Sequence, residues 1–243
     1  MAKLNRSATV CFRAFGLLVL SAACLAQTRP PIVEQMAKTY GIDSFGQVDA
    51  IRYTFNIQAG PINGVRSWTW EPKKDQVTFE GKDKSGKPVK VTYVRSQLSS
   101  QPDNVKKEVD PGFINDNYWL VFPFHVYWDT SADVQDKGMQ KLPNGKGTAR
   151  HVIVKYGSDG GYTPGDTWEL YLDKDNRIQE MAFHHGGSVK PQLVKMSWAG
   201  YKKAGPLLFS TEHSGTADGH PAHITFTNVA VKMAGSDNWE EAK

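Results

Sequence analysis

The stretch 51-IRYTFNI-57 alternates large apolar and polar side chains, and this alternation sets the fold class of the chain. Its residues Ile51, Tyr53, Phe55 and Ile57 would share one face of a strand, because successive side chains of a strand point to opposite faces. Three more alternating runs follow, separated by turn segments rich in Gly, Pro, Lys and Asp: 65-VRSWTWE-71, 76-QVTFEG-81 and 88-PVKVTYVR-95. Four such strands joined by short turns predict an antiparallel meander.

Alternating runs resume in the second half of the chain, where Gly residues and Asp/Asn pairs separate them. The expected strands are 149–157, 166–173, 177–185, 192–201, 206–214 and 222–231. Before the first strand, apolar residues recur at helical spacing over 32–40, and Gly41 follows as a stop signal. About ten strands with two or three short helices predict a mainly β (α+β) fold, with the helices on one face of an antiparallel sheet.

The segment between the two strand series, 113-FINDNYWLVFPFHVYWD-129, concentrates seven aromatic rings around a proline. Asp110 followed by Pro111 indicates a helix start with Asp110 as its N-cap, and Pro123 indicates an end. We therefore expect a short helix over 111–119 and then an extended segment. The helix would carry Asn115, Asp116 and Asn117 on its polar side, and the extended segment would place Phe124, Val126 and Trp128 opposite His125 and Tyr127.

The first residues predict export from the cytoplasm. Three basic residues precede the apolar stretch 14-AFGLLVLSAACLA-26, and no acid occurs before Glu34, as in a secretory signal peptide over 1-26. Cleavage after Ala26 would leave 27-243 as a single domain in the periplasm. The alternative is processing before Cys24 with a lipid attached there, which would anchor the protein to a membrane.

The charge balance limits the partners to be expected, and the positions of the cysteines limit how the domain can be stabilised. The 29 Lys and Arg residues oppose 25 Asp and Glu residues, and without the three leader bases the balance is 26 to 25. A nearly neutral domain gives no reason to expect nucleic acid or an anionic membrane surface as partner. Both cysteines, Cys11 and Cys24, lie in the leader, so the remaining domain must hold together by burial.

The sequence gives only weak signals for three kinds of site: a metal site, a calcium loop and a hydrolase active site. Adjacent His184 and His185 would point to opposite faces of a strand, so they cannot hold one metal ion together, and we expect no metal or cofactor. The segments 159-DGGYTPGD-166 and 173-DKDN-176 suit turns better than calcium loops, whose full spacing is absent. No nucleophile motif occurs, although carboxylates on expected strands leave a hydrolase open: Glu169, Glu180 and Glu212.

Aromatic residues are abundant on the expected strands. The chain has 7 Trp, 9 Tyr and 11 Phe. A curved sheet covered by few helices would either bury these rings as core or expose them in an apolar concavity. Both arrangements predict the same alternation, so the pattern alone does not separate them.

The run 167-TWELYLDKDNRIQEMAFHHGG-187 resembles the central hairpin of the periplasmic outer-membrane lipoprotein carrier (LolA-like) superfamily. The run 113-FINDNYWLVFP-123 is similar to the NDxYWLxxP signature of an uncharacterised exported family within that superfamily. The resemblance covers about 33–232 in element order. It implies a strongly curved antiparallel sheet, an unclosed half-barrel whose open side is covered by helices and whose concavity takes up acyl chains or other lipid groups. The carriers also use an arginine inside that cavity, for which Arg52 and Arg66 lie in the right region.

The resemblance and the strand faces together give a candidate site. The expected cavity wall is Tyr53, Phe55, Trp68, Trp70, Phe79, Tyr93, Trp168 and Leu170, and the expected lid or rim is Trp119, Phe122, Phe124, His125 and Trp128. The implied function is an exported, monomeric binding or carrier protein without catalysis. Its implied partners are a hydrophobic small molecule, a lipid or acyl chain, and an envelope lipoprotein. Two alternatives stay open: a cell-envelope hydrolase using strand carboxylates with His125 or His184, and a structural module with a self-packed cavity.

Overall fold

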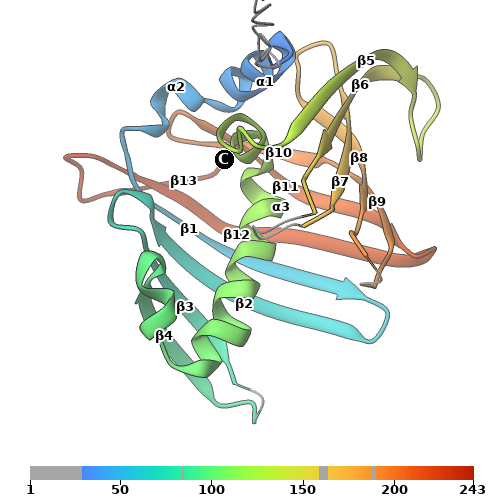
Figure 1. The fold of residues 1–243 in the computed structure, drawn as a ribbon. Coiled ribbons are helices and arrows are strands. Elements are labelled where there is room, and N and C mark those ends of the chain that lie inside the picture. Colours follow the sequence, from blue (N-terminus) through green and yellow to red (C-terminus); the bar gives the residue numbers. More distant parts are fainter. Residues whose placement is uncertain (1–28, 84, 159–163, 188–189) are drawn as a thin grey trace, which may run out of the picture.

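The computed structural model describes residues 29–83, 85–158, 164–187 and 190–243. The expected leader over 1-26, with Cys24, lies outside these residues, so the leader and the 27-243 domain stay predictions. Most of the expected turn over 159–166 also lies outside them. The described strands form one open antiparallel sheet of thirteen strands that curves around a long helix (Figure 1). The predicted unclosed half-barrel is therefore confirmed.

The strand order shows how the two strand series join. It is β4-β3-β2-β1-β12-β11-β9-β8-β7-β6-β5, with β10 paired to β11 and β13 paired to β12. The first four strands form the predicted meander: β1 (Val48–Ala59), β2 (Ile62–Glu71), β3 (Gln76–Lys82) and β4 (Pro88–Val94). Tyr53 pairs with Trp68, and Trp68 pairs with Phe79, so these rings stand in a row on one face. β12 (His220–Met233) pairs antiparallel with β1 and joins the two series.

The second series contains every strand expected there. It also has two additional strands, β5 and β13, and one expected strand is split into β9 and β10. Its strands are β5 (Asp133–Lys141), β6 (Thr148–Lys155), β7 (Thr167–Leu172), β8 (Ile178–His184), β9 (Leu193–Ser197), β10 (Ala199–Ala204), β11 (Leu207–Ala217) and β13 (Trp239–Glu241). The expected strand 192–201 divides at Trp198, because β9 and β10 pair with different parts of β11. Neither β5 nor β13 was predicted, since β5 is mostly exposed and β13 has only three residues.

The prediction of a helix-to-strand corner in the aromatic segment is wrong. A single element, α3 (Asp110–Trp128), continues through Pro123 and lies across the concave face of the sheet (Figure 1). The helix tolerates the proline because the backbone of Val121 leaves the helical region, at φ −117° and ψ 22°, and kinks the axis there. Short 3-10 helices over Pro72–Lys74 and Arg95–Ser100 and a short π-helix over Val105–Val109 precede it.

The polar residues near the start of α3 are buried and bind the sheet. Asp110 makes no capping hydrogen bond. Its carboxylate instead accepts hydrogen bonds from the Tyr93 hydroxyl at 2.9 Å and Arg95 Nε at 3.1 Å. Asp116 and Asn117 are buried rather than forming a solvated side. Both corrections have one cause: α3 is covered nearly all round, so its polar groups need protein partners.

Two short helices cover one end of the half-barrel. α1 (Pro31–Tyr40) is the predicted first helix, and Gly41 ends it, as expected, with the left-handed φ of 96°. α2 (Ile42–Phe45) follows directly. The hydroxyl of Tyr40 accepts a hydrogen bond from the Ile178 backbone N–H at 3.0 Å and lies 2.6 Å from the Tyr201 hydroxyl, which fixes α1 to β8 and β10.

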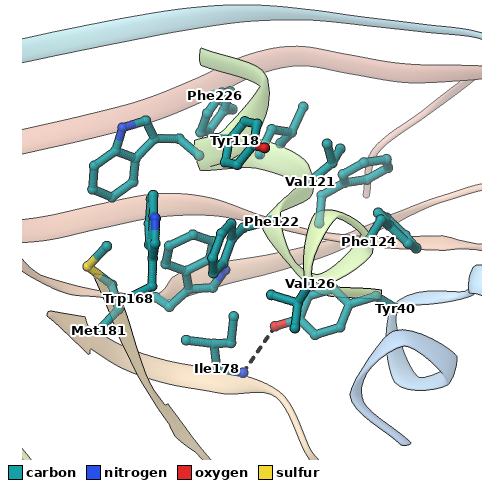
Figure 2. Packing of buried hydrophobic residues seen from close by; sticks show 14 of the residues in the cluster. Tyr40, Tyr118, Val121, Phe122, Phe124, Val126, Trp168, Ile178, Met181 and Phe226 are labelled. Carbon is teal, nitrogen blue, oxygen red and sulfur yellow. Dashed lines mark hydrogen bonds between the residues drawn. The ribbon is translucent and has the colours of Figure 1, made fainter. Parts of the chain in front are cut away.

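The core lies between α3 and the concave face of the sheet. Figure 2 shows Phe122 and Val126 of α3 pointing toward Trp168 and Ile178 of the sheet. The rings of Phe122 and Trp168 stack with centroids 4.1 Å apart, and Phe124 meets Tyr40 edge to face at 6.4 Å. Most of the concavity is thus filled by the side chains of α3.

Candidate binding groove

One part of the concave side stays open, along the edge of α3 that faces β7, β8 and β9. Two cavities of about 480 Å³ each lie there and share Asn115, Trp119, Phe183 and His185 in their walls. We call these two adjoining cavities together the groove. Each volume is within the range of natural ligand sites, roughly 300–1,000 Å³.

The two halves of the groove are built from different elements. The outer half lies between the β1–β2 turn, the β11–β12 turn and 190–196 before and within β9. The inner half follows α3 toward the start of β7. The apolar wall residues include Ile57, Ile62, Trp119, Phe183, Val194 and Met196. Ile62 is 55% exposed, so apolar surface reaches the mouth of the groove.

A buried aspartate orients a histidine in the wall. Asp166 is 4% exposed, and its Oδ1 accepts hydrogen bonds from the Gly186 N–H at 2.7 Å and from His185 Nδ1 at 3.2 Å. Gly186 permits this close turn, because a Cβ there would lie 2.3 Å from the carbonyl oxygen of Pro164. His185 is therefore held in place by the strand ends on both sides of it.

A second buried carboxylate anchors α3 beside the groove. Asp116 accepts two hydrogen bonds from Arg66 at 2.6 and 2.7 Å, and one from the indole N–H of Trp68 at 2.8 Å. The side-chain amide of Asn115 also donates to Asp116, at 3.0 Å. Burial raises the pKa of Asp116, and the guanidinium of Arg66 opposes that shift. The resemblance led us to expect an arginine inside the cavity, at position 52 or 66. Arg66 faces α3 and pairs with Asp116, whereas Arg52 pairs with Glu241.

The expected cavity-wall residues lie on the concave face, and most of them are covered by α3 or by neighbouring rings. Trp68 meets Phe113 of α3 at 5.5 Å and Phe79 at 4.8 Å, Trp70 meets Phe113 at 6.1 Å, and Tyr53 and Phe55 each pack on Phe226. Tyr93 binds Asp110 and Leu170 is buried. Tyr53 and Trp68 also border a separate cavity of about 110 Å³ with Arg52 and Asn228. Of the eight, Trp168 lines the groove.

The expected lid residues all belong to α3. Trp119 lines both halves of the groove, while Phe122 and Phe124 are fully buried and Trp128 packs 4.7 Å from Phe45. His125 stacks on Tyr118 at 3.9 Å, and its Nε2 lies 2.8 Å from Asn117 Oδ1. Burial lowers the pKa of His125 to about 3, so this side chain is neutral at physiological pH.

The residues proposed for hydrolase chemistry lie away from the groove. Glu169 is on the face of β7 opposite Trp168, where its two oxygens contact His151 at 2.9 Å and His184 at 2.8 Å. Since His185 lines the groove, the two adjacent histidines do point to opposite faces, as predicted. Glu180 accepts a hydrogen bond from the Asn144 N–H. Within the described ranges, no group of three His, Cys, Asp or Glu side chains is placed to hold a metal ion.

Most groove residues were not predicted from the sequence. The outer half is formed by turns, including Pro61, Pro191 and Pro221, whose meeting point depends on strand pairing over more than 150 residues. Ile57 was a detectable signal, because it continues the apolar face of β1 to the turn. Asp166 and His185 stand at the two outer ends of the hairpin expected around 173-DKDN-176, next to the pair Thr167 and His184, so the hairpin register was the signal that could have paired them.

Comparisons with known proteins find similarity in solved structures alone. No protein-family model matches the sequence, and no curated protein matches it. A DUF1329 family protein from Desulfovibrio piger matches with a TM-score of 0.47 at 10% identity, covering 86% of this chain and 96% of that one. A putative outer membrane lipoprotein-sorting protein domain from Vibrio parahaemolyticus matches with a TM-score of 0.48 at 10% identity, covering 88% and 96%.

A third solved structure is a LolA superfamily protein from Nitrosomonas europaea, with a TM-score of 0.44 at 7% identity, covering 85% of this chain and 94% of that one. The solved structures to which the chain is similar thus include LolA-like proteins. At these identities the likeness concerns the fold, and the properties of the groove follow from its own residues. Among the described helices, none has the length and apolar character needed to span a membrane.

Proposed function

We propose that this chain is an exported binding or carrier protein that holds an apolar or lipid-like ligand in the groove without catalysis. The observation that supports this most directly is the open apolar groove beside α3, because the side chains of α3 cover most of the other described rings of the concave face. The sequence resemblance to lipoprotein carriers agrees with an acyl chain as ligand and an envelope lipoprotein as its source. Export to the periplasm, or anchoring through Cys24, belongs to the same proposal.

The energetics suit a single hydrocarbon chain. Each buried CH₂ group contributes about 0.8 kcal/mol, so a chain that buries eight to ten of them gains roughly 6–8 kcal/mol before the costs of ordering. The walls contributed by Val194, Met196 and Ile224 offer no charge to such a chain. The binding would therefore depend on chain length more than on any single contact.

A fluorescent fatty acid titrated into the delipidated protein tests the proposal. Ala217→Trp would fill the groove, because Ala217 lines its outer half, and should abolish uptake. Thr216→Trp is the matched control, since neighbouring residues of β11 point to opposite faces. Saturable uptake by the wild type and by Thr216→Trp, lost in Ala217→Trp, is the expected result. Equal uptake by both variants would contradict a ligand in the groove.

A further inference from the structure

Two polar side chains stand at the junction of the two halves of the groove. Asn115 of α3 and His185 at the end of β8 line both halves, beside the apolar Trp119 and Phe183. Each of the two polar side chains is oriented by a buried carboxylate, Asp166 for His185 and Asp116 for Asn115. Because a carboxylate accepts hydrogen bonds, the atom that faces it must be a donor.

For His185 the partner fixes the tautomer. A carboxylate accepts hydrogen bonds, so Nδ1 of His185, 3.2 Å from Asp166 Oδ1, carries the proton. In the neutral ring Nε2 is then an acceptor. No described residue forms a hydrogen bond with Nε2, and it is not among the atoms sealed from solvent. The acceptor is thus available from the groove that His185 lines.

For Asn115 the partner fixes the amide orientation. The side-chain nitrogen of Asn115 donates to Asp116 Oδ1 at 3.0 Å, and Asp116 is 0% exposed. The carbonyl oxygen Oδ1 of Asn115 forms no hydrogen bond with a described residue. The junction therefore presents two acceptors, one from each side chain, in surroundings that are mainly apolar.

From this pair of acceptors we infer that the groove selects an amphiphile bearing a hydroxyl group at the junction, rather than a plain hydrocarbon or a ligand with acceptors alone. A hydroxyl donates to His185 Nε2 or Asn115 Oδ1, and its oxygen can accept the remaining N–H of the Asn115 amide. Asn115 is exposed and the His185 side chain is 30% exposed, so water can reach both acceptors in the free protein. A ligand that covers the junction without a donor would displace this water and leave both acceptors unpaired, which disfavours it. This inference rests on the proposed function and specifies its ligand class.

Matched probes test this inference: 1-decanol and decyl methyl ether, titrated at pH 8 into the full mature protein and followed by tryptophan fluorescence. The ether lacks the hydroxyl donor, so 1-decanol should bind roughly 3- to 10-fold more tightly. His185→Phe should remove most of that preference while both probes still bind. His223→Phe, at a histidine that borders a different cavity and bonds Ser214, should keep it.

Asp166→Asn provides a second variant that keeps the shape of the site. The Gly186 N–H donates to the same oxygen as His185 Nδ1, so the asparagine carbonyl oxygen would take that position, Nδ1 would keep its proton and Nε2 would stay an acceptor. The preference for 1-decanol should therefore persist in Asp166→Asn, although the charge of Asp166 is lost. Equal binding of both probes to the wild type would overturn the selection of a hydroxyl and leave the apolar groove standing. Failure of both probes to bind would overturn the proposed function and this inference together.

Discussion

His213 shows how burial of one side chain makes stability depend on pH. It is fully buried on β11, with its ring 4.2 Å from that of Trp198, and burial lowers its pKa to about 3 from the usual 6.5. The unfolded chain therefore takes up a proton at a pH where the folded chain does not. The stability linked to this histidine is present above pH 6.5 and is lost as the pH falls toward 3.

We expect His213→Leu to weaken the pH dependence of unfolding. Between pH 7 and pH 5, wild-type protein should lose about 2 kcal/mol of unfolding free energy through this residue. His125, whose pKa is also lowered to about 3, should contribute a similar loss in both proteins. Urea denaturation at the two pH values measures the difference. An unchanged pH dependence in His213→Leu would show that the imidazole is not buried as described.

Asp116 is the residue whose loss should loosen α3 most. Replacing it with Asn removes the charge that pairs with Arg66, whose side chain is 32% exposed, and weakens the bond to Trp68. Breaking a buried pair costs about 3 kcal/mol, so Asp116→Asn should lower the unfolding free energy by about that amount. Asp103→Asn, which removes exposed pairs with Lys106 and Lys107, should leave the unfolding free energy nearly unchanged.

Chemical denaturation of these two variants beside the wild type gives both values. A loss in Asp116→Asn no larger than in Asp103→Asn would mean that the Arg66 pair does not hold the helix to the sheet.

Among the secondary-structure elements, the junction between α1 and α2 depends on a glycine. Gly41 has φ of 96°, and a Cβ there would lie 2.5 Å from the carbonyl oxygen of Pro206. Gly41→Ala should therefore destabilise the protein by about 2 kcal/mol or more. Gly46 has helical dihedrals, and a Cβ added there would meet nothing within 4 Å, so Gly46→Ala should be neutral or stabilising by up to about 1 kcal/mol.

Thermal unfolding followed by circular dichroism compares these two alanine variants. Equal melting temperatures would contradict the close approach of α1 to the segment before β11.

The strands were predictable from sequence because their signal is local, whereas the course of α3 was not. Alternation around Tyr53 and Phe55 is visible in a seven-residue window. Pro123 ordinarily ends a helix, and the sequence does not show that a kink at Val121 absorbs it. The burial of Asp116 likewise depends on Arg66, fifty residues away, which only the folded sheet brings to α3.

For the molecule as a whole, the sequence predicted a curved sheet with helices on its open side, but the position of the open space came from the structure. The rings expected as cavity wall mostly pack against α3, and the groove lies where three turns meet the other edge of that helix. Single-sequence patterns do not report which concave surface a helix leaves uncovered. That the protein is a monomer remains a prediction. Pro88 and Lys90 on edge strand β4 agree with it, because proline and lysine on an edge strand disfavour pairing with another chain.

Whether the groove holds an apolar chain can be decided by photo-crosslinking a diazirine-bearing fatty acid to the mature protein and mapping the labelled peptides by mass spectrometry. We expect labels on 190–197 and 215–224, which form the outer half of the groove, and their loss when unlabelled fatty acid competes or when Ala217→Trp is used. Labels confined to the outer face of the sheet, around Glu169 and Tyr171, or labels that competitor does not remove, would refute a ligand in the groove.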